Sequence, residues 1–234
     1  MADSNVYEDP YRTFLQGDAE KDTKWKYGYP SYEVVNKLFE AERTNVWAPG
    51  TIEYEVQGLV KNWEMEVLHK ADVNQYRSMD PTKFSVWVNV KSLSTGKPTN
   101  GAGGYNGTLQ TSLPEKYRIY NPDEETTESS LKIFNSVFNR GFALEILQVY
   151  SGPPVIVYKF RHWGYMESPY KGHAATGELI QFICIGIFTL ENEKIVKAEF
   201  FFDPADVLTG LIKGPELDGS AKGAASSCPF GKLA

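Results

Sequence analysis

The sequence has few of the residues that build disulfide scaffolds and metal centres. Among its 234 residues are two cysteines and three histidines. Two cysteines exclude a disulfide framework and every four-cysteine zinc site. Three histidines argue against a multi-histidine metal site. No complete Walker loop, dinucleotide glycine motif or Gly-x-Ser-x-Gly elbow occurs. We therefore expect no metal and no cofactor.

Basic charge and long hydrophobic runs are also scarce. The 24 Lys and Arg residues are outnumbered by 30 Asp and Glu, which gives a net charge of −6. Binding to nucleic acid needs a basic face, so nucleic acid is not an expected partner. The longest apolar stretch, 179–190, contains Gln181 and Gly186 and is too short to span a bilayer. The polar start does not resemble a signal peptide, and two unpaired cysteines fit a reducing compartment. We expect a cytoplasmic protein with no membrane partner.

Aromatic residues, by contrast, are abundant. They make up 14% of the chain, with 14 Tyr, 13 Phe and 5 Trp. Such an excess is typical of a β-rich core, because aromatic side chains fit pleated surfaces. It is equally typical of a ring-lined pocket for an organic ligand. The two interpretations are compatible.

Hydrophobic periodicity predicts helices before a series of strands. Capping residues and apolar stripes predict helices over 31–43, 51–70 and 126–138, and a short closing helix over 205–213. Alternation predicts strands over 84–90, 142–150, 155–166, 178–190 and 195–203, and 91–107 is predicted as a loop. This order indicates an α+β fold, in which three helices cover a curved antiparallel sheet. We expect a polar arm over 1–17, one domain over 18–213 and a disordered tail over 214–234.

The strand predicted over 155–166 carries the first candidate site. Side chains alternate along a strand, so His162 shares a face with Tyr158 and Phe160. On that face His162 is either a core residue satisfied by a hydrogen bond or a general acid or base in an apolar pocket.

The strand predicted over 195–203 presents a similar choice. Its even-numbered face is wholly apolar, which by pattern alone turns Glu199 toward water. If both sides of the sheet are covered, Glu199 lies inside and its pKa is raised toward neutrality. Asp203 either reaches the site or caps the closing helix. Trp63, on the apolar stripe of the second helix, is either a core residue or a platform for a ligand.

Several motifs resemble the pathogen-related protein family of plants and fungi. The resemblance covers about residues 11–213 and is carried by LFEAER at 38–43, NWEMEVLHK at 62–70, GGYN at 103–106, RIYNPD at 118–123, YSGPP at 150–154, KFRHWGYME at 159–167 and KAEFF at 197–201. That family in turn resembles the SnoaL-like branch of the nuclear transport factor 2-like superfamily. The resemblance implies a cone of curved antiparallel sheet with helices across it.

The same resemblance suggests a function. SnoaL-like proteins include cyclases, isomerases and dehydratases that work without a cofactor, and similar fungal proteins are implied in ring-forming steps of secondary metabolism. Asp203 matches their acid ahead of a short helix, whereas Glu199 replaces the more usual tryptophan. Domains of this kind commonly pair through the outer sheet face, so a homodimer is expected.

Two hypotheses follow. In the first, the chain is a cofactor-free cyclase or isomerase, with a pericyclase such as a Diels–Alderase as one form, acting on a hydrophobic oxygenated metabolite. In the second, it is a non-catalytic small-molecule-binding protein of the stress or pathogen response. The catalytic candidates are His162, Glu199 and Asp203, and the substrate-binding candidates are Trp63, Trp87, Tyr105, Tyr158, Phe160 and Phe201.

Overall fold

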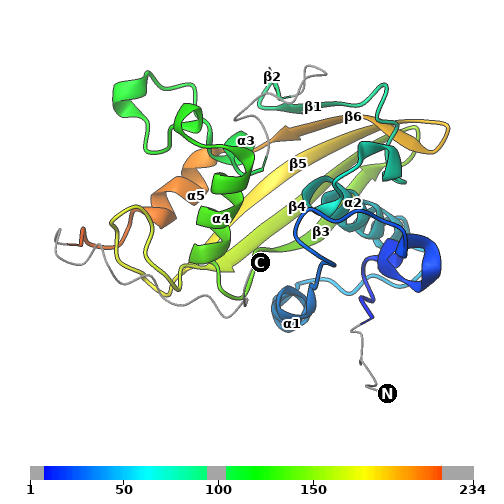
Figure 1. Cartoon of the computed structure of the whole chain (residues 1–234), viewed down its shortest axis with the longest axis horizontal. Coiled ribbons are helices and arrows are strands. Elements are labelled where there is room, and N and C mark those ends of the chain that lie inside the picture. Colours follow the sequence, from blue (N-terminus) through cyan, green and yellow to red (C-terminus); the bar gives the residue numbers. More distant parts are fainter. Residues whose placement is uncertain (1–7, 94–103, 218–234) are drawn as a thin grey trace. The chain divides into compact units, whose positions relative to one another are not determined.

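The computed structural model describes residues 8–93 and 104–217 (Figure 1). Its helices are α1 Glu33–Glu42, α2 Ile52–His69, α3 Asn106–Leu109, α4 Thr127–Val137 and α5 Pro204–Leu211. Its strands are β1 Ser85–Val88, β2 Lys91–Ser92, β3 Ala143–Ser151, β4 Val155–Tyr165, β5 Leu179–Glu191 and β6 Lys194–Phe201. Short 3-10 helices lie at Thr13–Leu15, Gly17–Glu20, Val73–Gln75, Glu115–Tyr117 and Pro122–Glu124. The predicted α+β class is confirmed.

The strands form one six-stranded sheet in the order β2-β1-β6-β5-β4-β3. Asn192 and Glu193 connect β5 to β6 with φ values of 48° and 62°, as a two-residue type I′ hairpin requires. The short β2 pairs antiparallel with β1 through Trp87 and Ser92. The predicted loop over 91–107 was therefore partly wrong, because it contains β2 and the start of α3, while residues 94–103 lie outside the described residues.

The described chain divides into two compact units. Unit 1 comprises residues up to Phe84, Ala143–Phe160 and Ile185–Ala198. Unit 2 comprises Ser85–Phe142, Arg161–Cys184 and the residues from Glu199 onward.

In unit 1, α1 and α2 pack against β3 (Figure 1). Thr51 caps α2 by accepting a hydrogen bond from the Tyr54 amide at 3.3 Å, as the sequence predicts. A buried ion-pair cluster anchors the other end of this helix. The Lys70 ammonium lies 2.9 Å from a carboxylate oxygen of Glu20 and 2.9 Å from one of Glu66. The Lys70 side chain is fully buried beside these acids.

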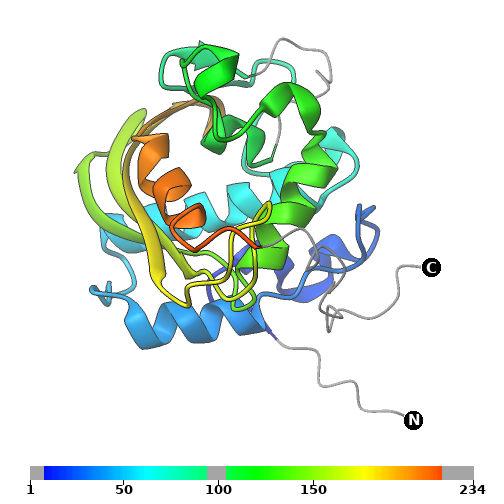
Figure 2. The ribbon, with the colours of Figure 1, turned by 90° about the vertical axis from the view of Figure 1, so that its left-hand side faces the viewer.

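In unit 2, a capping box at Thr126 and Ser129 begins α4. Helix α5 lies against β5 (Figure 2), where a Cβ on Gly210 would come within 2.6 Å of Ile180. The absence of a side chain at Gly210 therefore permits this close approach.

Both predicted terminal segments are only partly described. Residues 1–7 of the predicted arm and 218–234 of the predicted tail lie outside the described residues. Asp9 and Arg12 of the arm are buried in unit 1. Residues 214–217 of the tail are bound within unit 2, where the Leu217 amide donates to the Gly172 carbonyl at 2.7 Å.

Candidate functional site

His162 occupies the buried face of β4 within unit 2. Its side chain is 8% exposed. The Phe142 ring stacks on it with centroids 4.5 Å apart, and the Phe182 ring stacks with centroids 5.6 Å apart. Both rings are nearly parallel to the imidazole, at 25° and 28°. The structure thus places a titratable imidazole in an apolar, aromatic environment.

A glycine two residues along the same face of β4 makes this stack possible. A Cβ on Gly164 would lie 2.7 Å from the Phe138 ring, 2.8 Å from the Gly141 carbonyl oxygen and 2.8 Å from the Phe142 ring. Real Cβ atoms do not approach other atoms so closely. The missing side chain therefore lets residues 138–142 lie directly on the strand, which brings Phe142 onto His162.

The stack is part of a longer row of aromatic contacts in unit 2. Phe142 also contacts Phe138 and Phe134, with centroids 4.7 Å and 4.9 Å away. Tyr105 stacks on Phe134 at 3.5 Å. At the other end, Phe182 contacts Phe202 at 4.7 Å. We call these seven side chains the aromatic row: Tyr105, Phe134, Phe138, Phe142, His162, Phe182 and Phe202.

The aromatic row contains two of the predicted site residues, His162 and Tyr105. Sequence reasoning missed Phe142 and Phe182, the rings that touch the imidazole. Phe182 lies on the buried face of β5, whose alternation was readable. The contact between Phe182 and His162 could not be predicted from the sequence, because it depends on the register between β5 and β4.

The carboxyl end of β6 divides its predicted residues between two faces. Val196 and Ala198 are buried on the even-numbered face, and Phe202 extends that face to the aromatic row. Glu199, half-buried, and Phe201, 37% exposed, follow the odd-numbered face. Alternation alone turns Glu199 toward water, whereas the structure leaves this residue half-buried.

Asp203 caps α5. Its Oδ1 accepts a hydrogen bond from the Ala205 amide at 2.9 Å, and its side chain is otherwise exposed. This geometry accounts for Asp203 by helix capping alone.

Three of the other predicted residues meet in unit 1. Phe188 joins them, with its ring centroid 5.4 Å from Trp63 and 5.3 Å from Tyr158, and Tyr158 contacts Phe160 at 5.7 Å. A Cβ on Gly186 would overlap the Tyr158 ring. Because Tyr158 and Phe188 are both fully buried, these rings pack on one another as a hydrophobic core does. Trp87 lies elsewhere, half-buried on β1 in unit 2.

The remaining histidines have separate environments. Burial lowers the pKa of His69 to about 4, assisted by the nearby Arg12 charge. Nδ1 of His173 lies 3.0 Å from the Gly214 carbonyl oxygen. Within residues 8–93 and 104–217, no three His, Cys, Asp or Glu side chains come together in a way that could hold a metal ion. The same residues contain no helix that is both long and apolar enough to cross a bilayer.

A comparison with known proteins finds one curated relative that spans the chain. The "Pathogen-related protein" of barley, Hordeum vulgare, is 44% identical over 233 residues, which cover 98% of this chain and 97% of the barley protein. No protein-family profile matches the chain.

Several solved structures show a weaker likeness. A candidate SnoaL-like polyketide cyclase from Jannaschia sp. is 16% identical, with 73% of this chain and 99% of that chain covered and a TM-score of 0.39. A candidate polyketide cyclase from Streptomyces antibioticus is 10% identical, with 65% and 95% covered and a TM-score of 0.39. A nuclear transport factor 2-like protein from Burkholderia thailandensis is 11% identical, with 77% and 95% covered and a TM-score of 0.35.

Proposed function

This chain belongs to the pathogen-related protein family, and from that premise we propose that it is a cofactor-free cyclase or isomerase acting on a hydrophobic, oxygenated small molecule. The observation that carries the proposal is the stacking of both Phe142 and Phe182 against His162. An apolar, ring-bearing substrate gains stacking and area burial against such rings. A single imidazole among them is suited to move a proton or to orient an oxygen.

The reaction has two possible forms, which differ in what they demand of His162. An acid–base cyclisation needs the imidazole to exchange a proton with the substrate. A pericyclic step, such as a Diels–Alder reaction of a secondary metabolite, needs shape and orientation more than a proton. Holding the reacting ends together supplies much of the rate in that case.

The test compares two replacements of neighbouring residues. His162→Phe keeps a flat ring against Phe142 and Phe182 but removes the proton-transferring nitrogens. Phe182→Ala keeps the imidazole but removes one stacking ring. Each variant would be incubated with linear poly-β-ketones and diene-containing polyketides, and turnover would be followed by mass spectrometry. Melting temperatures would control for folding.

The outcomes separate the two forms. For an acid–base step, His162→Phe should lower turnover by about 10²-fold or more. For a pericyclic step, His162→Phe should retain most of the turnover and Phe182→Ala should lose it. Full turnover in both folded variants would contradict the proposed site.

A second function has a specific observation in its favour. In unit 1 the Phe188 ring packs on both Trp63 and Tyr158, so these two candidate residues fill a core and take no part in a reaction there. The barley relative's name also gives no reaction. The alternative is a non-catalytic protein of the stress or pathogen response that binds a small molecule. Saturable binding of a panel compound that is recovered unchanged would favour it.

A further inference from the structure

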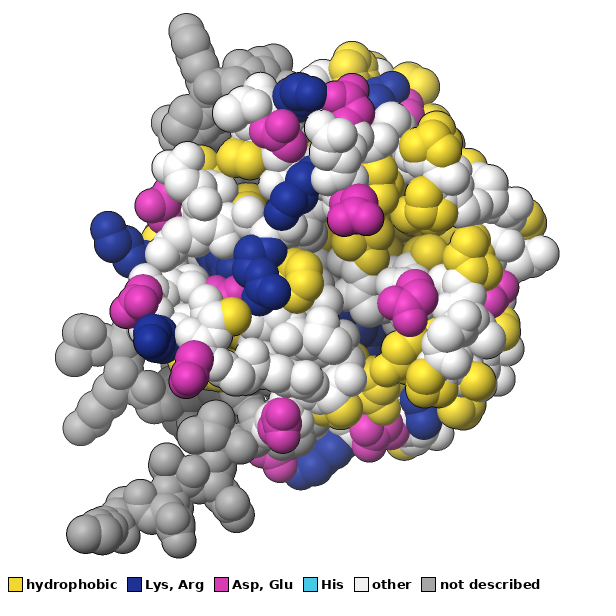
Figure 3. Space-filling model, turned by 90° about the vertical axis from the view of Figure 1, so that its right-hand side faces the viewer, with side chains coloured by type: hydrophobic (Ala, Val, Ile, Leu, Met, Phe, Trp, Pro, Cys, Tyr) yellow, Lys and Arg dark blue, Asp and Glu magenta, His cyan; other side chains and the backbone are white. Residues whose placement is uncertain are grey.

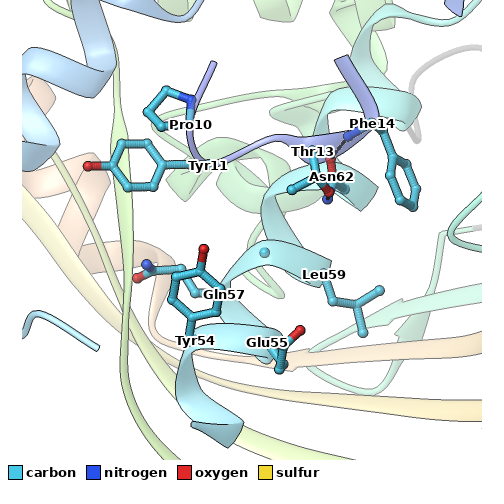
Figure 4. Close-up of a pocket in the computed structure, with 10 residues that line it drawn as sticks. Pro10, Tyr11, Thr13, Phe14, Tyr54, Glu55, Gln57, Leu59 and Asn62 are labelled. Carbon is cyan, nitrogen blue, oxygen red and sulfur yellow. Dashed lines mark hydrogen bonds between the residues drawn. The ribbon is translucent and has the colours of Figure 1, made fainter. Parts of the chain in front are cut away.

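A groove of about 240 Å³ runs along α2 in unit 1, between this helix and residues 10–14 (Figure 4). Pro10, Tyr11 and Phe14 line one side, and Tyr54, Gly58 and Leu59 line the other. We propose that this groove binds a neutral sugar ring. The groove lies within unit 1, whereas His162 belongs to unit 2, so the inference does not depend on the reaction proposed for His162.

The two sides of the groove are held together by hydrogen bonds. Oδ1 of Asn62, on α2, accepts from the Phe14 amide at 3.1 Å, and Nδ2 donates to the Thr13 hydroxyl at 3.2 Å. Farther along the segment, Asp9 accepts from the Tyr11 and Arg12 amides at 2.8 Å and 3.0 Å. The segment is therefore fixed opposite the helix, which lowers the entropic cost of binding a ligand between them.

Gly58 keeps the middle of the groove open. A Cβ built on this residue meets no other atom within 4 Å. A side chain at this position would project into free space. In a helix interior, glycine also makes the helix less stable than alanine would. The chain thus leaves a hollow at a position where a side chain would have room.

The groove offers ring faces together with hydrogen-bonding groups. Figure 4 shows Tyr11 extending from the N-terminal segment and Tyr54 from α2, with the hollow between them. Oε1 of Gln57 accepts from the Ile146 amide at 3.3 Å, so its amide NH₂ is the group left to donate to a ligand. The exposed Glu55 carboxylate can accept from hydroxyl groups. A pyranose presents apolar C–H faces and a rim of hydroxyls, which match this combination.

The charges around the groove favour a neutral ligand. Among the described residues, Glu55 is the only charged one that lines the groove, and it opposes an anion. Tyr11 already has charged neighbours of both signs, since its hydroxyl donates to Oε1 of Glu40 at 2.8 Å. Nη1 of Arg43 lies 3.4 Å from the Tyr11 hydroxyl oxygen, and Nζ of the buried Lys61 lies 4.5 Å from the ring centroid. A cation stacked on Tyr11 would be repelled by the Arg43 and Lys61 side chains. Figure 3 shows basic and acidic side chains interspersed over one face of the molecule.

The test measures binding of methyl β-glucopyranoside, methyl β-galactopyranoside and methyl N-acetyl-β-glucosaminide by saturation-transfer NMR and calorimetry. The comparison compounds p-cresol and choline represent an aromatic and a cationic ligand. Gly58→Leu fills the hollow, and Tyr54→Ala removes one wall. Tyr117→Ala serves as the matched control, because Tyr117 is an exposed tyrosine in unit 2.

We expect at least one pyranoside to bind the full chain with a millimolar Kd. Gly58→Leu and Tyr54→Ala should each weaken that binding at least tenfold, while Tyr117→Ala leaves it unchanged. Because Tyr54 lies at the surface, its variant tests the groove even if Gly58→Leu fails to fold. The inference is overturned if no pyranoside binds, if only p-cresol or choline binds, or if both folded groove variants bind as the unaltered chain does.

Discussion

At the scale of single residues, burial decides which ionisable side chains form ion pairs or have shifted pKa values. Sequence patterns give little information about the burial of a charged residue. Lys61, on α2, and Lys70, which directly follows that helix, are both buried, yet their surroundings differ completely. Lys70 is paired with two carboxylates. Nζ of Lys61 lies 3.3 Å from the centroid of the Phe39 ring, and burial, aided by the Arg12 charge, lowers its pKa well below the usual range. The Glu66 partner of Lys70 is local, four residues earlier in the chain, whereas Glu20 and the Phe39 ring beside Lys61 come from distant segments that the local sequence does not reveal.

His69 gives the first prediction, which concerns pH. Its pKa is about 4 in the folded chain, against 6.5 for a free histidine. Between these values the unfolded chain binds the proton and the folded chain does not. The free energy of unfolding should therefore fall as the pH is lowered from 6.5 to 4, by on the order of 2 kcal/mol from this residue.

Urea unfolding at a series of pH values would test the effect. His69→Gln removes the titrating group, and His173→Gln, in a half-buried loop position, serves as the control. The His69 variant should show a smaller loss of stability between pH 6.5 and 4 than the unaltered chain. If the His69→Gln variant and the unaltered chain lost equal stability, His69 would not contribute to the pH dependence of unfolding.

At the scale of elements, local signals were sufficient for most helices and strands. Thr51 and Thr126 were recognisable as caps, and both accept the expected backbone hydrogen bonds. Alternation located β3 to β6 within a few residues. The short β2 was missed because it consists of two residues, Lys91 and Ser92, with no pattern of their own. Its existence depends on pairing with β1.

The site residues were harder to predict than the elements. Alternation correctly identified the buried face of β4 that carries His162. It could not show that Phe142, just before β3, would stack on that side chain. The contact depends on Gly164, whose missing Cβ admits the 138–142 turn. Such contacts arise from strand register and close packing between segments far apart in the chain.

The second prediction concerns Asp203 and separates capping from catalysis. Asp203→Ala should destabilise the fold by about 1 kcal/mol, because the Ala205 amide loses its acceptor. Asp203→Ser keeps a capping oxygen but removes the carboxylate. We expect it to retain both the melting temperature and the turnover. A stable serine variant with strongly reduced turnover would instead assign Asp203 a chemical role.

At the scale of the whole molecule, the third prediction is a homodimer. The outward side of the sheet in unit 2 exposes large apolar side chains on neighbouring strands, Leu179 and Ile183 on β5 and Phe201 on β6. Exposed apolar residues gathered on one surface commonly mark a contact with another chain. We therefore expect a second copy of this chain to cover them.

Light scattering tests this expectation. The molar mass measured for the unaltered chain should be about twice the 26.3 kDa of one copy, and the Ile183→Lys variant should have the mass of a monomer. Val46→Lys, an exposed position in unit 1, should remain dimeric. A monomeric unaltered chain would contradict the prediction, and a dimer unaffected by Ile183→Lys would place the interface elsewhere.

The most direct test of the central claim, that a small molecule binds against His162, is an NMR titration of the histidine side chains. The chain contains three histidines, and His69 and His173 provide internal controls. With ¹³C-labelled histidine, addition of 1,8-dihydroxyanthraquinone, a flat oxygenated probe, should shift the His162 ring signals selectively, because the ligand rings would lie beside the imidazole. Unchanged His162 signals at saturating probe, or shifts confined to His69 or His173, would contradict the account.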